Sequence, residues 1–290
     1  MTANSTSPLR PLNVGNVVSA GLSLYRTHFK AYTGLSAKAL LWYLVPIYGW
    51  AKAITIAGQI GRLGFRELIH QPEPLPTAYA QVQPRLWAFL GVTILVTLIQ
   101  IVVNFAASIV GTLLLFPIML LPSIVGEVGA ALSSLLSVAM QILLLLVQLW
   151  FQARFMLYDL AIAVETDSEA VSSIGRSWRL TQGSAFRVQG VLLLSYLIMA
   201  PIYILTSIPL MFTFPLLARL SVGAPETEIA SLAALVALAF LIFFILLLVA
   251  GIFTMPFYQS IKAVLYYDLR SRREGLDIQL ADRGPADEPV

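Results

Sequence analysis

Cysteine and charge are what this sequence lacks. It has no cysteine, and only 11% of its 290 residues are Asp, Glu, Lys or Arg, whereas soluble domains carry about 25%. Without cysteine, neither a disulfide nor a thiolate metal site can form. With so little charge, the chain cannot cover the surface of a water-soluble globule. The mean hydropathy of +0.83 and several uncharged runs of roughly 18 or more residues instead predict an integral membrane protein.

Histidine is also scarce. The two histidines, His28 and His70, lie far apart and outside the apolar runs. Metal-assisted hydrolysis needs clustered carboxylates and histidines, and other catalysis needs a nucleophile with a base or a pair of carboxylates. We therefore expect no enzyme, no cofactor and no metal site. The net charge of +3 is too small to indicate a nucleic-acid partner.

The uncharged runs set the expected number of spans. As a single helix, residues 87–121 would extend about 50 Å at 1.5 Å per residue, which exceeds the roughly 30 Å hydrocarbon core. This run must therefore tilt, break near Asn104 or Pro117, or fold into two short spans. Three later runs are each long enough to span once: 131–152, 188–217 and 229–258.

The preceding apolar region, residues 31–60, allows two topologies. Lys38 and Lys52 bracket a stretch too short to span, with Pro46 near its middle. Either the lysines extend to opposite interfaces around one span, or Pro46 breaks a re-entrant hairpin. We favour an all-α bundle of about six transmembrane helices, in which 31–60 crosses once and 87–121 crosses twice. The alternative is four long spans plus the hairpin. The two topologies place the following Pro-rich loop on opposite sides of the membrane.

Two segments have the pattern of interfacial amphipathic helices. Residues 13–30 place apolar side chains on one face and basic ones on the other, and residues 168–182 have arginines opposite an apolar face. Asp167 or Ser168 can cap the second helix, which ends at Gly183. Such helices lie flat in the headgroup layer; the alternative is ordinary packing on the rest of the chain. The expected organisation is a disordered tail, one helical membrane domain and a disordered cytoplasmic tail: 1–12, 13–270 and 271–290.

Basic residues are distributed unevenly among the loops. The turn at 122–130 has none and the loop at 218–229 has only Arg219. The insert between residues 154 and 187 and the C-terminal segment are both rich in arginine. Because basic loops remain in the cytoplasm, we expect the insert and both termini on the cytoplasmic side.

Three blocks of the sequence resemble one known family. They are the opening "PLNVGNVVSAGLSLYRTHF", the insert "AIAVETDSEAVSSIGRSWRLTQGSAFRVQGVLLL" and the closing "PFYQSIKAVLYYDLRSRREGLDI". The family is a bacterial multi-span group named for the glycerophosphoryl diester phosphodiesterase membrane domain. In fused members a separate soluble barrel carries out the hydrolysis, and this chain is expected to be a stand-alone member without that barrel.

The resemblance implies a six-span protein of the bacterial cytoplasmic (inner) membrane and assigns it no reaction. It marks signature residues, which are candidates for contact with lipid headgroups rather than for catalysis. The matching positions are Glu165, Arg176, Ser177, Trp178, Arg179, Gly183, Tyr267, Asp268, Arg270, Arg273 and Glu274.

These features favour a non-catalytic membrane protein that organises lipid or a membrane protein complex. Its expected partners are the bilayer, anionic phospholipid at the cytoplasmic face, and a membrane protein or a second copy of the chain. The alternative is a transporter or channel for a small solute or lipid. The polar groups within the apolar runs are amides, which more often join helices by hydrogen bonds: Gln100, Asn104, Gln141 and Gln148.

Overall fold

The computed structural model describes residues 12–165, 169–223 and 225–276. Over these residues every regular element is a helix and no strand occurs, which confirms the expected all-α fold. The expected disordered tails lie mostly outside the described residues, as do Asp167 and Ser168. The helix that precedes the C-terminal tail continues to Glu274, a few residues beyond the expected boundary.

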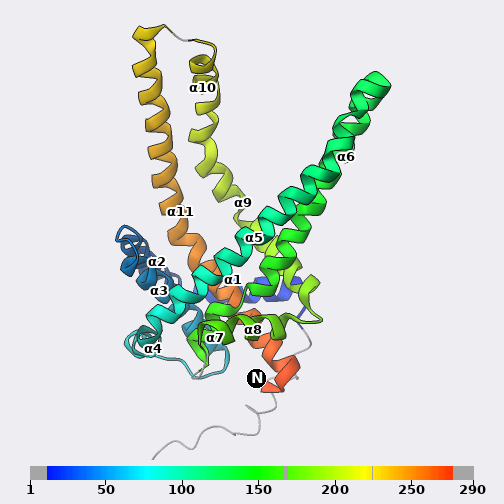
Figure 1. Cartoon of the computed structure of the whole chain (residues 1–290). Helices are drawn as coiled ribbons and strands as arrows, with labels where there is room; N and C mark the ends of the chain where they lie inside the picture. Colours follow the sequence, from blue (N-terminus) through cyan, green and yellow to red (C-terminus); the bar gives the residue numbers. More distant parts are fainter. Residues whose placement is uncertain (1–11, 166–168, 224, 277–290) are drawn as a thin grey trace, which may run out of the picture.

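Short helices form a base, from which long helices rise as two diverging arms (Figure 1). The elements of the base are α1 (Val14–Thr27), α2 (Phe29–Tyr43), α3 (Tyr48–Leu68), α4 (Leu75–Val82), the 3-10 turn η1 (Gln83–Arg85), α7 (Tyr158–Val164) and α8 (Ala170–Thr181). The arms consist of α5 (Leu86–Met119) with α6 (Leu121–Phe155), and of α9 (Ala185–Met211) and α10 (Thr213–Ser221) with α11 (Glu226–Glu274).

Helix α1 begins with a side-chain cap and packs into the base by its apolar face. The Asn13 Oδ1 accepts the N–H of Asn16 at 2.7 Å. The helix crosses α11 so closely that a Cβ on Gly21 would lie 2.9 Å from the Cα of Ile261. The backbone breaks at His28, so the expected helix over 13–30 is divided between α1 and the start of α2.

Residues 31–60 form a helical hairpin. Helices α2 and α3 are joined by a short turn that contains Pro46, where Ile47 adopts a positive φ of 59°. Neither helix is among the four that are long and apolar enough to span a membrane. Within the structure this region therefore has the form of the alternative prediction and not of one continuous span.

Helix α5 is continuous where two short spans were favoured. Asn104 does not interrupt it, because its Nδ2 donates to the Gln100 carbonyl of the preceding turn at 2.8 Å. Pro117 lies in the last turn, where a proline ends a helix and cannot divide it. The chain reverses directly into α6, which is kinked at Gly126 (φ 65°).

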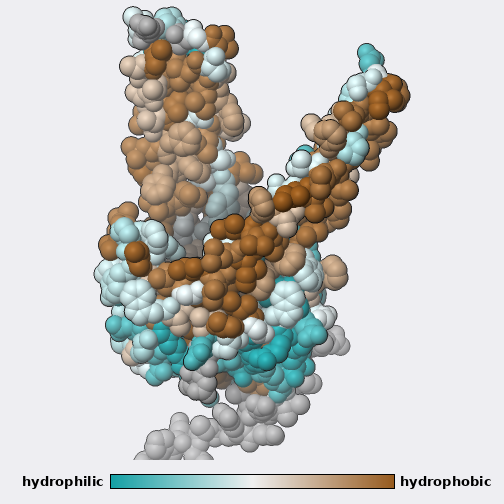
Figure 2. Space-filling model, in the orientation of Figure 1, coloured by the Kyte–Doolittle hydropathy of each residue, from teal (hydrophilic) through white to brown (hydrophobic). Residues whose placement is uncertain are grey.

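Four long apolar segments could cross a membrane by length and composition, and they run through α5, α6, α9 with α10, and α11. Hydrophobic residues cover both arms, whereas hydrophilic residues gather at the base (Figure 2). In the most apolar 18-residue stretch of each segment, only 22%, 0%, 28% and 6% of the residues are buried, in chain order. The core therefore lies in the base, around residues such as Leu157, Ile261 and Tyr266, and the arms are exposed.

Candidate functional site

Five side chains, here called the α8 network, join helix α8 to the ends of α7 and α11. Arg176 Nε donates to Glu165 Oε1 at 2.7 Å, and Arg176 Nη1 also contacts Glu274 Oε1. The Tyr266 hydroxyl donates to Glu165 Oε1 at 2.6 Å, and Arg270 Nε donates to Glu274 Oε2 at 2.9 Å. Because these residues come from the ends of α7 and α11 and from α8, the network joins three segments that are distant in sequence.

The α8 network keeps Arg176 charged and holds its guanidinium between two carboxylates. Burial alone would lower the pKa of this guanidinium, but the hydrogen bonds and charges of Glu274 and Glu165 outweigh it and raise the pKa above its ordinary value. An arginine held by two carboxylates is not free to bind a lipid phosphate. Arg179, one turn further along α8, is exposed and remains the better candidate for that contact.

Arg154 lies buried beneath α8 among aromatic rings. Its guanidinium carbon is 4.0 Å from the centre of the Trp178 ring. The Ser177 hydroxyl, which is fully buried, donates to the Arg154 carbonyl at 2.9 Å and accepts the Leu157 N–H at 3.1 Å. Ser177 and Trp178 therefore have structural partners, namely the backbone and side chain at the end of α6.

Asp268 forms a second charged cluster on α11. Its carboxylate contacts Arg187 at the start of α9 and Arg272 on the next turn, the latter at 3.1 Å. It also accepts the Leu12 N–H at 3.3 Å, and both arginines donate to the Leu12 carbonyl. The chain just before α1 is thereby fixed against the C-terminal helix.

A third charged cluster joins α3 to the loop before α4. Arg62 donates to both oxygens of Glu73, at 2.9 and 2.8 Å, and to the Ala163 carbonyl at 2.7 Å. Arg66 contacts the same carboxylate at 2.7 Å. Burial alone would raise the pKa of Glu73, but the two arginines outweigh it and hold the pKa below its ordinary value.

The structure thus brings most of the signature residues together at the base. Four of them meet in the α8 network, Arg273 donates to the Gln182 carbonyl, and Gly183 ends α8 with a positive φ of 70°. Tyr267 packs against the core. Sequence reasoning missed several partners that lie outside the matched blocks or at unmatched positions within them: Arg62, Glu73, Arg154, Arg187 and Tyr266. The only signal for them was their place at the ends of apolar runs.

A cluster of polar side chains, here called the floor, lies where the arms join the base: Gln152, Tyr158, Asp159, Tyr196 and Lys262. The Asp159 carboxylate is buried within it. Lys262 Nζ of α11 contacts Asp159 Oδ2 at 2.7 Å, and this lysine also lies near Tyr158 and Tyr196. The Tyr196 hydroxyl of α9 donates to Gln152 Oε1 of α6 at 3.0 Å. The Tyr196–Gln152 hydrogen bond therefore joins the two arms, and the Lys262–Asp159 pair joins α11 to α7 of the base.

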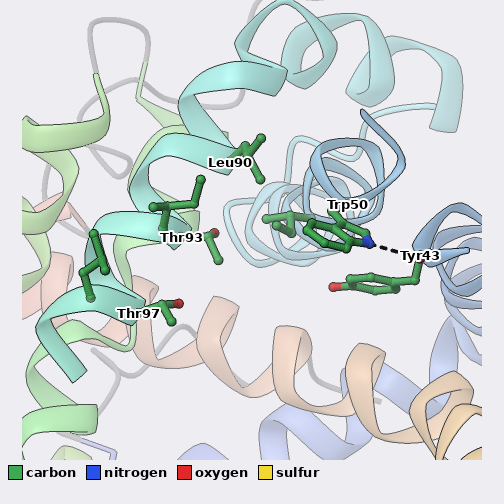
Figure 3. A pocket seen from close by; sticks show the side chains of 8 residues that line it. Tyr43, Trp50, Leu90, Thr93 and Thr97 are labelled. Carbon is green, nitrogen blue, oxygen red and sulfur yellow. Dashed lines mark hydrogen bonds between the residues drawn. The ribbon is translucent and has the colours of Figure 1, made fainter. Parts of the chain in front are cut away.

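A cavity of about 360 Å³ opens beside the floor, between α5 and the α2–α3 hairpin. Thr93 and Thr97 of α5 face Tyr43 and Trp50 across it (Figure 3). The Trp50 indole donates to the Tyr43 carbonyl at 3.1 Å, which fixes one wall. The two threonine hydroxyls and the Tyr43 hydroxyl are polar groups in a lining that is mostly apolar.

Fold and site together define a helical protein with four potential membrane spans on a charged base. The family model called "Domain of unknown function (DUF7847)" matches residues 74–266, about two thirds of the chain, and the chain belongs to this family. The match begins at α4 and ends within α11, so it covers both arms, α7 and α8. No curated protein and no solved structure matches the chain.

Proposed function

We propose that the protein is a non-catalytic integral membrane protein that organises lipids or other membrane proteins around its two arms. The arms cross the bilayer and the base lies at the cytoplasmic surface, because the base carries nearly all of the arginines and basic segments stay inside. The bilayer is the inner membrane of a bacterium, as the family resemblance implies. That resemblance to the glycerophosphoryl diester phosphodiesterase membrane domain remains a prediction.

The exposed surface of the arms carries this proposal. A helix bundle that encloses a pathway for a small solute packs its spans against one another, whereas here the most apolar stretches of α6 and α11 are 0% and 6% buried. Such surfaces become covered by lipid or by the helices of a partner. The charged residues of the base support the same function, since they hold α8 and the C-terminal helix in place through mutual ion pairs.

The topology that accords with this proposal is four spans plus a cytoplasmic hairpin. The six-span prediction needed residues 31–60 to cross the membrane once and residues 87–121 to cross it twice. Because α5 is one continuous helix, residues 87–121 cross only once in this topology. The α2–α3 hairpin packs beside α5 and α11 at the base, and its loop to α4 is bound by Arg62. The Pro-rich loop then lies on the same side as α8.

Extraction from native membranes without detergent, followed by mass spectrometry of the co-extracted molecules, tests the proposed function. We expect a stoichiometric membrane protein or a reproducibly enriched phospholipid. Arg179→Gln should reduce any enrichment of anionic lipid. Arg26→Gln is the matched control, because it removes one positive charge from an exposed position on α1. A protein extracted alone, with bulk lipid composition and a tightly held small solute, would instead establish the transporter.

A further inference from the structure

Both helices of the first arm carry a row of polar residues, here called the ladder. On α5 it consists of Thr93, Thr97, Gln100, Asn104 and Ser108; on α6 it consists of Ser134, Ser137, Gln141, Gln148 and Gln152. Spacings of three, four and seven residues keep each row on one face of its helix. Each row therefore forms a continuous polar stripe within an otherwise apolar segment.

The two stripes face the same side of the arm. Half-buried Val103 and Ala107 of α5 are each followed by a ladder residue. On α6, half-buried Met140 is followed by Gln141, whereas the ladder residues Ser137 and Gln148 are themselves half-buried at the edge of the helix contact. The close approach of Gly111 to Leu144 marks the contact between the helices. One residue further along turns each helix by about 100°. Because α5 and α6 are antiparallel, this same turn directs both stripes to one side of the arm.

That side is the inner one, between the two arms. The lowest ladder residue of α6, Gln152, accepts a hydrogen bond from Tyr196 of the opposite arm, and Tyr196 packs edge-to-face on Tyr258 of α11. The lowest ladder residue of α5, Thr93, lies beside Tyr158. The ladder consequently begins at the floor and continues up the inner side of the first arm. The second arm, which contains α11, is covered by hydrophobic residues (Figure 2).

Exposed amides and hydroxyls at membrane depth need polar partners, because an unsatisfied polar group in hydrocarbon costs several kcal/mol by order of magnitude. Asn104 and Gln141 are exposed, and the only hydrogen bond of the Asn104 side chain within the described residues is the one its Nδ2 donates to the Gln100 carbonyl. The side chains of Gln141 and Gln148 make no hydrogen bond within the described part of the chain. The stretch from Thr93 to Ser108 rises about 22 Å along α5, which is most of the hydrocarbon thickness.

We propose that the ladder holds phospholipid headgroups as they pass between the two leaflets. A headgroup carries phosphate and ester oxygens that accept hydrogen bonds, and the ladder offers uncharged amide and hydroxyl donors. The Lys262–Asp159 pair of the floor is largely buried and satisfied by its own neighbours, so the proposed headgroup contacts are those of the uncharged ladder groups. The acyl chains remain in the membrane between the splayed arms. This inference rests on the proposed membrane function and names the lipid class that the arms engage.

Leaflet exchange can be measured directly with the intact chain in phosphatidylcholine vesicles that contain a trace of lipid labelled on its headgroup with a fluorophore. An external reductant bleaches about half of the label in sealed vesicles without exchange. We expect nearly complete bleaching with the wild-type protein. The triple variant Asn104→Leu, Gln141→Leu and Gln148→Leu should exchange at least tenfold more slowly. It removes polar groups from apolar surroundings, so it should insert and migrate as the wild type does on gel filtration.

Ser207→Leu on α9 is the control, because it replaces a polar residue outside the ladder and should leave the rate unchanged. Bleaching that stops at half with the wild type, or a triple variant as fast as the wild type, would overturn the inference. Cross-linking of Gln141→Cys to a stoichiometric protein in native membranes, without lipid exchange, would show that the ladder binds a partner helix. In either case specific co-extraction could still succeed, so the two proposals fail separately.

Discussion

Arg62 has the most constrained surroundings of the charged side chains discussed above. Its guanidinium is almost fully buried, uses both edges of the Glu73 carboxylate, and reaches the Ala163 carbonyl of α7. Only a planar group with several fixed donors can make this set of contacts. The residue therefore connects α3, the α4 loop and α7, the elements that support the first arm.

Replacing Arg62 should destabilise the protein far more than replacing its neighbour. Arg62→Gln removes the bidentate pair and leaves the Ala163 carbonyl without its donor, so we expect a loss of about 3 kcal/mol. Arg66→Gln leaves Glu73 its main partner, and its side chain is 30% exposed, so the loss should be below about 1 kcal/mol. Thermal unfolding in detergent measures both. Equal losses would show that the buried geometry of Arg62 has no special role.

The same carboxylate predicts a pH dependence. The pKa of Glu73 in the folded protein lies below its ordinary value of 4.5. Its stabilising effect is thus complete above that ordinary value and is lost as pH falls through the lowered pKa. The stability difference between the wild type and Glu73→Gln should be constant near neutral pH and shrink as the pH falls below 4.5 and through the lowered pKa. A difference independent of pH in melting curves would contradict this.

Sequence reasoning at the residue scale found the groups and one of their pairings, that of an arginine of the insert with Glu165, but not the rest of the network. Glu165, Arg176, Arg270 and Glu274 were singled out by resemblance, yet nothing in their spacing indicated that all four meet. The network forms because α8 folds back across the ends of α7 and α11, and such a return depends on tertiary packing. Lone charges at the ends of apolar runs, such as Arg62, look like topology signals in the sequence.

Helices were easier to predict than their lengths. The insert was expected to form a helix ending at Gly183, and α8 does so. Of the options for residues 87–121, the favoured division into two spans was wrong, because α5 is one continuous helix. A long helix can tilt, or extend beyond the hydrocarbon at either end, and Pro117 falls too near the end of α5 to break it.

Replacing two glycines of the α8 region by alanine should change the stability of the protein in opposite directions. Gly183 has φ +70°, where any other residue is strained, so Gly183→Ala should destabilise by about 1 kcal/mol. Gly175 lies within α8, and a Cβ there would meet nothing within 4 Å. Gly175→Ala should therefore stabilise by roughly 0.5 to 1 kcal/mol. Melting temperatures that shift in the same direction for both would refute the helix end assigned here.

At the scale of the whole molecule, composition predicted a helical membrane protein, and the structure supplies four apolar helices that could span the bilayer. The divergence of the arms could not be predicted. Hydropathy indicates which segments can lie in lipid, but it does not indicate which helices pack beside one another. The position of the α2–α3 hairpin also depends on packing. Close contacts such as Gly58 against Phe89 place it beside α5, and no local pattern specifies that pair.

The most direct test of this architecture is the sidedness of three introduced cysteines, which the absence of native cysteine makes free of background. Thr77→Cys is at an exposed position of α4, and Ser172→Cys is at an exposed position of α8. Val222→Cys is at the tip of the second arm, where Val222 is 88% exposed. An impermeant maleimide should label only Val222→Cys in intact cells, and all three after permeabilisation. Labelling of Thr77→Cys from outside, with Ser172→Cys protected, would contradict the four-span architecture and restore the six-span one.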